Sequence, residues 1–85
     1  MKPYWVYIAI CSDGSLYTGI AVDVQKRIDI HNAGRGSKYT RARLTIRIGY
    51  AEKVQGKSRA LRREIEIKRL SRIAKLLLCE KGALY

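Results

Sequence analysis

The stretch that decides the fold is residues 4–21, which read YWVYIAICSDGSLYTGIA. Residues 4–11 and 15–21 are rich in aromatic and β-branched side chains, which favour β-strands. Between them, Asp13-Gly14 is a strong hairpin signal, because glycine adopts the backbone angles that tight turns need. The sequence therefore predicts two antiparallel strands joined by a short connection.

The length of that connection decides which face of the sheet each tyrosine occupies. A two-residue turn at Asp13-Gly14 places Tyr7 and Tyr17 on opposite faces, because a shift of one residue inverts a strand. A three-residue loop over 13–15 with a bulge places both on one face. We predict the shared face, because a site built from both phenols needs it and the sequence allows it.

The middle of the chain predicts a helix, a loop and a third strand. Asp23 is a suitable helix N-cap and Gly34 a suitable stop, which gives a helix over 24–32. Residues 33–43 form a basic loop with two glycines. In residues 44–54 apolar and polar side chains alternate, as in a half-buried strand whose inner face carries Leu44, Ile46, Ile48 and Tyr50.

Two further helices are predicted towards the end of the chain. Ser58 can cap a helix over 59–70. Ser71 can cap another over 72–81, which Gly82 ends.

The predicted element order is β-β-α-β-α-α. Eighty-five residues make one small domain, 1–85. The simple arrangement is a three-stranded, mostly antiparallel sheet flanked by helices, in the α/β (α+β) class.

Charge points to the kind of partner. The chain carries 18 basic and 7 acidic residues, a net charge of +11. Such a field attracts a polyanion. Nucleic acid is favoured over membrane, because no apolar run approaches the ~18 residues of a membrane span and no segment is both basic and lipid-facing. No signal peptide is visible, so a cytoplasmic protein is expected, with Cys11 and Cys79 as reduced thiols.

Charged residues interrupt the apolar face of the first predicted helix. At 100° per residue, Val24, Ile28 and Ile30 define an apolar arc, and Arg27 and His31 fall inside it. Ionised groups on an inward face are costly unless they are paired, coordinated or open to a cleft.

The helix over 59–70 repeats this anomaly. Glu64 and Lys68 fall within the arc of Leu61, Ile65 and Ile67, whereas Arg63 lies on the outer face. One reading is an internal ion pair between Glu64 and Lys68, four residues apart. The other is a polar cleft where the two helices meet the hairpin.

The order of these residues resembles that of the GIY-YIG nuclease domain, especially its small free-standing bacterial branch (UPF0213-like). The resemblance spans residues 4–70. The residues that carry it are, in chain order, Val6-Tyr7-Ile8, Tyr17-Thr18-Gly19, Arg27, His31 and Glu64.

The resemblance implies a role for each catalytic residue. Tyr7 is expected to be the general base toward the attacking water, and Tyr17 to position water or substrate. Arg27 is expected to bind the scissile phosphate, and His31 to relay a proton or hold a tyrosine. Glu64 is expected to ligate one divalent cation, Mg²⁺ or Mn²⁺, with waters and phosphate oxygens completing its shell.

The basic loop and the second motif supply candidate nucleic-acid contacts. Lys38, Arg41 and Arg43 surround Tyr39, so cations follow a phosphate backbone while the ring stacks a base. The alternative is an ordinary solvated loop. Gly19 either allows close approach of the backbone to substrate or permits a bend.

The resemblance has two gaps. Trp5 stands where the first motif usually has glycine, and no asparagine follows Glu64, as it does in some larger relatives. The absent asparagine puts a secondary substrate contact in doubt.

The sequence thus predicts a metal-dependent endonuclease that hydrolyses DNA with low sequence specificity, prefers single-stranded or irregular DNA, and serves DNA repair. One alternative is a non-catalytic module that binds DNA or RNA on the same fold. Another is a nuclease subunit that needs a protein partner for specificity.

Overall fold

Three antiparallel strands form the centre of the molecule. The computed structural model describes residues 1–81. Strand β1 (Pro3–Ile10) lies between β2 (Leu16–Ala21) and β3 (Arg47–Gln55), so the order is β2-β1-β3. The predicted three-stranded antiparallel sheet is confirmed, and β2 is one of its two edges.

The hairpin places both tyrosines on one face. Tyr7 pairs with Gly19, and Tyr17 pairs with Ala9, which shares a face with Tyr7 two residues away. The shared face is therefore confirmed, and the two-residue turn is wrong.

The hairpin loop itself lies one residue earlier than predicted. The backbone N–H of Cys11 donates to the carbonyl of Ser15 at 2.9 Å, which leaves residues 12–14 as the loop. Gly14 closes this loop with a φ of 84°, in the left-handed region that glycine accepts without strain.

Helix α1 (Val24–Ile30) continues into a π-helical turn, η1 (His31–Arg35), inside which Gly34 leaves the helical conformation with a φ of 80°. The predicted stop is therefore correct. The predicted basic loop contains one element that the sequence did not reveal, the short helix α2 (Lys38–Arg41). Ser37 caps α2, because its hydroxyl accepts from the backbone N–H of Thr40.

Helices α3 (Lys57–Lys68) and α4 (Arg72–Lys81) follow the sheet. The prediction of Ser58 as a cap is wrong, since α3 begins after Gly56 without a side-chain cap. Ser71 does cap α4, with its hydroxyl 3.1 Å from the N–H of Ala74. The predicted stop at residue 82 lies outside the described residues.

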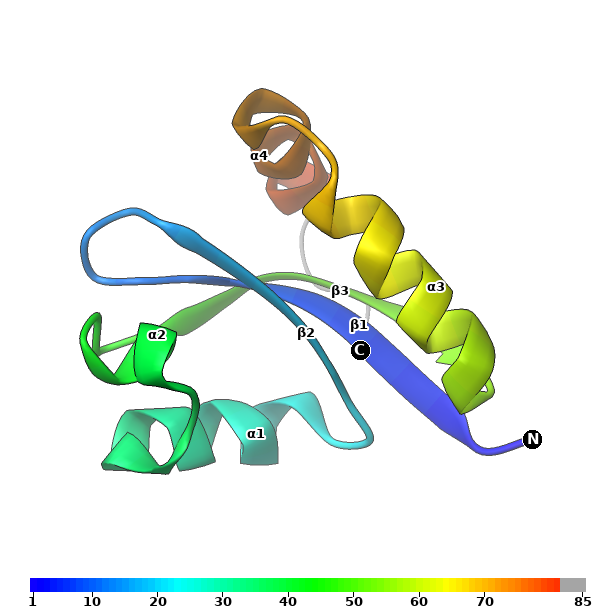
Figure 1. Cartoon of the computed structure of the whole chain (residues 1–85), viewed down its shortest axis with the longest axis horizontal. Coiled ribbons are helices and arrows are strands. Elements are labelled where there is room, and N and C mark those ends of the chain that lie inside the picture. The colour runs from blue at the N-terminus through cyan, green and yellow to red at the C-terminus, as the bar shows by residue number, and fades with distance from the viewer. Residues whose placement is uncertain (82–85) are drawn as a thin grey trace.

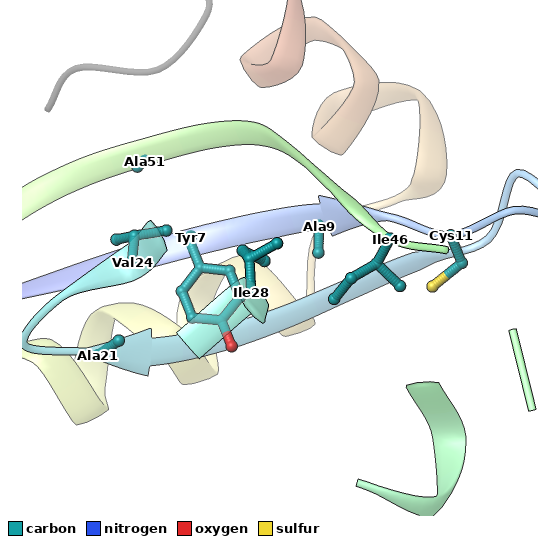
Figure 2. Packing of buried hydrophobic residues seen from close by; sticks show 8 residues of the cluster. All are labelled: Tyr7, Ala9, Cys11, Ala21, Val24, Ile28, Ile46 and Ala51. Carbon is teal, nitrogen blue, oxygen red and sulfur yellow. The ribbon is translucent and has the colours of Figure 1, made fainter. Parts of the chain in front are cut away.

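The sheet has a core on each face. Figure 1 shows α1 and α2 on one side of the strands and α3 and α4 on the other. On the α1 side, the ring of Tyr7 lies among apolar side chains that include Val24, Ile28 and Ile46 (Figure 2). On the α3 side, Val6 and Ile8 pack against a second cluster. Both cysteines are free thiols, as predicted.

A bulge in β3 turns the side chain of Tyr50 to the other face of the sheet. Ile8 pairs with Tyr50 whereas Ala9 pairs with Ile48, so Gly49 is an extra residue in β3. Tyr50 consequently packs with the α3 side, although the alternating pattern had placed it on the same face as Ile48.

Helix α3 is rotated relative to the face predicted from its sequence. Ala60 and Ile67 are fully buried, whereas Leu61 and Ile65 are 40% and 48% exposed. Arg63, predicted to face outward, is half-buried and donates to both carboxylate oxygens of Glu52 at 3.0 and 3.1 Å. This pairing to β3 and the close approach that a small Ala60 permits explain the rotation.

No helix among residues 1–81 is long and apolar enough to cross a membrane.

The rotated face of α3 predicts unequal costs for two isoleucines on this helix. Ile67→Ala should lower the free energy of unfolding by about 2–5 kcal/mol, because it leaves a cavity in the core. Ile65→Ala should change it by no more than about 0.5 kcal/mol, as expected for an exposed position. Urea denaturation of both variants measures the difference, and equal losses would contradict the orientation of α3.

Candidate functional site

The site begins where a glycine on the edge strand faces a tyrosine on the central strand. Tyr7 and Gly19 lie directly opposite each other. A Cβ atom at residue 19 would lie 2.7 Å from the Tyr7 hydroxyl and 2.9 Å from Cζ, which no side chain tolerates. Gly19 therefore lets the phenol extend across β2. The two roles predicted for Gly19, close approach to substrate and a bend, stay predictions; the close approach in the structure is to the protein's own Tyr7 ring.

The Tyr7 hydroxyl meets His31 at the start of η1. The phenol oxygen lies 3.4 Å from His31 Nε2, and both side chains are buried, with 1% and 3% exposed. Tyr17 packs beside them, its ring edge-on to His31 at 5.4 Å between centroids. The structure thus brings together both tyrosines and the histidine that the sequence singled out.

Thr40 fixes the protonation of the histidine ring. Its hydroxyl lies 2.8 Å from His31 Nδ1 and donates its own proton to the carbonyl of Ser37 at 3.1 Å. With its proton on that carbonyl, the hydroxyl accepts from Nδ1–H. His31 Nε2 therefore carries a lone pair toward Tyr7, whose hydroxyl donates to it.

Burial and nearby charge keep both groups neutral. Burial, with further contributions from Tyr17 and Glu64, raises the pKa of Tyr7, and Arg27 only partly opposes this. Burial and then the charge of Arg27 lower the pKa of His31 below its usual 6.5. At neutral pH the pair is therefore a phenol donor and an imidazole acceptor.

Arg27 stands at the open side of this pair. It is exposed, and it lines a hollow of about 330 Å³ with Asp23, Lys26 and Ile30 among its neighbours. The prediction that Arg27 and His31 share a buried arc is therefore right for His31 and wrong for Arg27. Helix α1 buries Val24 and Ile28, so Arg27 faces solvent while its charge still acts on Tyr7 and His31.

Glu64 approaches from the opposite face of the sheet. Its side chain is only 16% exposed, and its charge raises the pKa of Tyr7. Lys68 lies 3.6 Å from Glu64 Oε2, so the ion pair that the sequence allowed is formed. The carboxylate is therefore paired with Lys68, and its charge also acts on Tyr7.

The donor set around Glu64 suits one kind of metal. Among residues 1–81, no three or more His, Cys, Asp and Glu side chains gather closely enough to hold an ion by themselves. A single carboxylate, with water and phosphate oxygens, is an arrangement that Mg²⁺ accepts and structural zinc does not. Glu64 therefore fits a cation that is completed by substrate.

The basic loop contributes an aromatic ring to the site. Tyr39 stacks on Tyr17, with ring centroids 6.1 Å apart and an angle of 29°. Arg43 covers Tyr39, with its guanidinium carbon 3.9 Å from the ring centre, and pairs with Asp13 at 3.2 Å. Arg43 is thus held by internal contacts, and its contact with nucleic acid stays a prediction. Lys38 and Arg41 are exposed on α2.

Sequence reasoning missed Thr40 and Ser37 as members of the site. Thr40 is fully buried, and it joins the site only because α2 folds back onto η1. One signal was present: Ser37 lies three residues before Thr40, a spacing typical of a helix cap. A buried imidazole also needs a partner for each ring nitrogen.

The comparison with known families agrees with this geometry. The family model described as "GIY-YIG catalytic domain" matches residues 3–76. This range includes both tyrosines, Arg27, His31 and Glu64. The chain belongs to the GIY-YIG family. Because the GIY-YIG family is a nuclease superfamily, the membership of this chain supports nucleic acid as its general class of partner.

Relatives of this GIY-YIG domain are found in staphylococci. A UPF0213 protein of Staphylococcus saprophyticus is 50% identical over 82 residues, covering 96% of this chain and all of the relative. A UPF0213 protein of Staphylococcus aureus is 49% identical over 81 residues, covering 95% and 99%.

Two solution NMR structures share the fold. The UPF0213 protein BH0048 from Bacillus halodurans has a TM-score of 0.59 and 42% identity, over 94% of this chain and 85% of that one. A protein from E. faecalis has a TM-score of 0.62 and 32% identity, over 95% and 86%. This chain therefore shares its fold with both proteins.

The lowered pKa of His31 predicts how stability depends on pH. Because its pKa is lower in the folded than in the unfolded chain, protonation favours unfolding. The stability that the neutral His31 ring provides is present above the ordinary pKa of 6.5. It is lost as the pH falls through the pKa of His31 in the folded chain. Urea denaturation at about pH 7.5 and about pH 5.5 should show this loss.

The control is His31→Gln, which removes the only histidine of the chain. This variant should lose much less stability between the two pH values. An equal loss in the wild type and in the variant would contradict a buried, neutral His31.

Proposed function

We propose that this chain is a metal-dependent endonuclease that hydrolyses phosphodiester bonds in DNA. The observation that carries the proposal is the hydrogen-bonded chain from Tyr7 through His31 to Thr40, with Arg27 and Glu64 beside it. A proton acceptor, a phosphate-binding cation and a carboxylate for a metal ion are the groups that hydrolysis by water requires.

Tyr7 and His31 form the proton path in this proposal. The attacking water gives a proton to the Tyr7 oxygen as the phenol proton moves to His31 Nε2. The oxygen of the former water forms the new bond to phosphorus, and the ester oxygen leaves with the electrons of the broken bond. His31 becomes an imidazolium whose Nδ1–H still donates to Thr40. A phenol whose pKa is raised serves as a relay because the imidazole accepts its proton.

In this proposal, Arg27 and the cation at Glu64 neutralise the negative charge of the phosphate. The exposed guanidinium of Arg27 can bind two phosphate oxygens in parallel. Glu64 would hold Mg²⁺ or Mn²⁺, which supplies positive charge to the phosphate when bound. Lys68, its ion-pair partner at 3.6 Å, becomes available to a neighbouring phosphate once the cation shares the carboxylate.

Single-stranded or irregular DNA is the proposed substrate, cut with low sequence specificity. Exposed cations contact the phosphate backbone, which carries no sequence information. The stacked rings of Tyr17 and Tyr39 suit unpaired bases, because any base offers a flat face to an aromatic ring.

The ion pair between Glu64 and Lys68 favours a second candidate function. A carboxylate already neutralised by a lysine fits a module that binds nucleic acid without cutting it. Such a module would have a salt-dependent affinity and no metal requirement.

Cleavage of labelled single-stranded and double-stranded DNA, with Mg²⁺, with Mn²⁺ and with chelator, separates the two functions. The wild type should cut only with metal and should cut single strands faster. Tyr7→Phe and Glu64→Ala should each lower the rate by roughly 100-fold or more, as for other groups that act in the transition state.

Glu66→Ala is the matched control, because Glu66 lies two residues from Glu64 on α3 and is 65% exposed. It should cut like the wild type. Binding without cutting in every metal, or equal rates for Glu64→Ala and Glu66→Ala, would favour the binding module.

A further inference from the structure

A groove along the edge strand β2 lies next to the tyrosine site. Two adjoining pockets of about 270 and 190 Å³ share Leu16, Tyr39 and Lys75. Tyr17 and Lys68 line the first, and Arg72 lines the second. We call these six residues the β2 groove.

The groove combines an aromatic wall with positive charge. The stacked rings of Tyr17 and Tyr39 and the side chain of Leu16 form an apolar surface, and Tyr39 is 39% exposed. The charged side chains of the groove are all cations, from α3 and α4; no described Asp or Glu lines it. Of these cations, Lys68 is paired with Glu64 at 3.6 Å. Apolar surface bordered by the remaining positive charge suits a nucleobase attached to a phosphate.

Each end of the groove is held in place. Arg72 donates to the carbonyl of Gly14 at 2.9 Å, which fixes α4 to the hairpin loop. Arg43 covers Tyr39 at 3.9 Å and keeps that ring beside Tyr17. Lys75 is half-buried and has no carboxylate of residues 1–81 within ion-pair distance, so its charge is available to a ligand.

The groove continues the line of the proposed reaction site. Along β2, the hollow beside Arg27 includes Ala21, Gly19 lies under the Tyr7 hydroxyl, and Leu16 opens the groove. Five residues of strand cover about 17 Å, at ~3.3 Å each. A polynucleotide strand lying along this edge can therefore contact both hollows at once.

We propose that the β2 groove binds an unpaired nucleotide next to the cleaved bond of a single-stranded polynucleotide. The base packs against Leu16 and the exposed edge of the Tyr39 ring, whose faces are covered by Arg43 and Tyr17. The adjoining phosphates contact Lys75 and the N–H groups of Arg72 that Gly14 does not use. This inference rests on the proposed function and adds the subsite that selects unpaired strands. A paired base cannot enter, because its face is covered by its neighbours in the duplex.

The test compares two labelled probes of the same length and charge, an oligothymidylate and an oligomer of abasic deoxyribose phosphates. Their binding is measured by fluorescence anisotropy in chelator, so that no cleavage occurs. The wild type should bind the base-bearing probe roughly fivefold to 100-fold more tightly, which is the range for one stacked base.

Two variants of Tyr39 test whether the groove causes the preference for the base-bearing probe. Tyr39→Ala should bring the ratio of the two affinities close to one, and Tyr39→Phe should retain it, because only the hydroxyl is removed. A fully paired duplex probe should bind Tyr39→Ala and the wild type equally. The proposal is overturned if the wild type shows no preference or if Tyr39→Ala keeps it.

Two lysines test the phosphate contacts of the groove. Lys75→Ala should weaken binding of both probes by the same factor, and by more than Lys53→Ala does. Lys53 is an exposed lysine on β3, at the other edge of the sheet. Equal effects of the two variants would mean that Lys75 acts only through the overall positive charge of the protein. That result would overturn its place in the groove. A matching oligouridylate arm shows whether RNA is bound in the same way.

Failure of the groove and failure of the nuclease proposal give different results. Cleavage that persists while Tyr39→Ala leaves the affinity ratio unchanged overturns the groove alone. A ratio that depends on Tyr39, in a protein that cuts no DNA in any metal, overturns the nuclease proposal and retains the groove as a single-strand binding site.

Discussion

The site depends on the contact between Tyr7 and the backbone of Gly19. A tyrosine on the central strand of a sheet ordinarily ends beneath its neighbours, but here the opposing residue has no side chain and the phenol crosses the edge strand. That crossing brings the hydroxyl to His31, which Thr40 holds in one tautomer. Any side chain at residue 19 would displace the ring and separate these groups.

The edge strand is also where both faces of the sheet meet. Helix α1 and the turn η1 bring Arg27 and His31 from one face, and α3 brings Glu64 from the other. Because no further strand covers β2, these groups converge beside a strip of surface that an extended chain can reach. A domain of 85 residues can thus collect acid, base and cation without an enclosed pocket.

Much of this arrangement could be predicted from local sequence. The strand pattern and Asp13-Gly14 indicated the hairpin, and polar residues at inward positions of two helices indicated a site. The rotation of α3 could not be predicted, because Leu61 and Ile65 look like core residues until the pairing of Arg63 with Glu52 is known. The pairing of His31 with Thr40 likewise depends on how the chain folds back after Gly34, which periodicity does not encode.

The most direct test of this account is the protonation of the His31 ring, observed as imidazole ¹⁵N chemical shifts in uniformly labelled protein above pH ~7. Since the chain has one histidine, the two nitrogen signals need no assignment between residues. The account predicts a proton on Nδ1, donated to Thr40, and a bare Nε2 facing Tyr7. A proton on Nε2 would contradict it, because His31 could then not accept the proton of Tyr7.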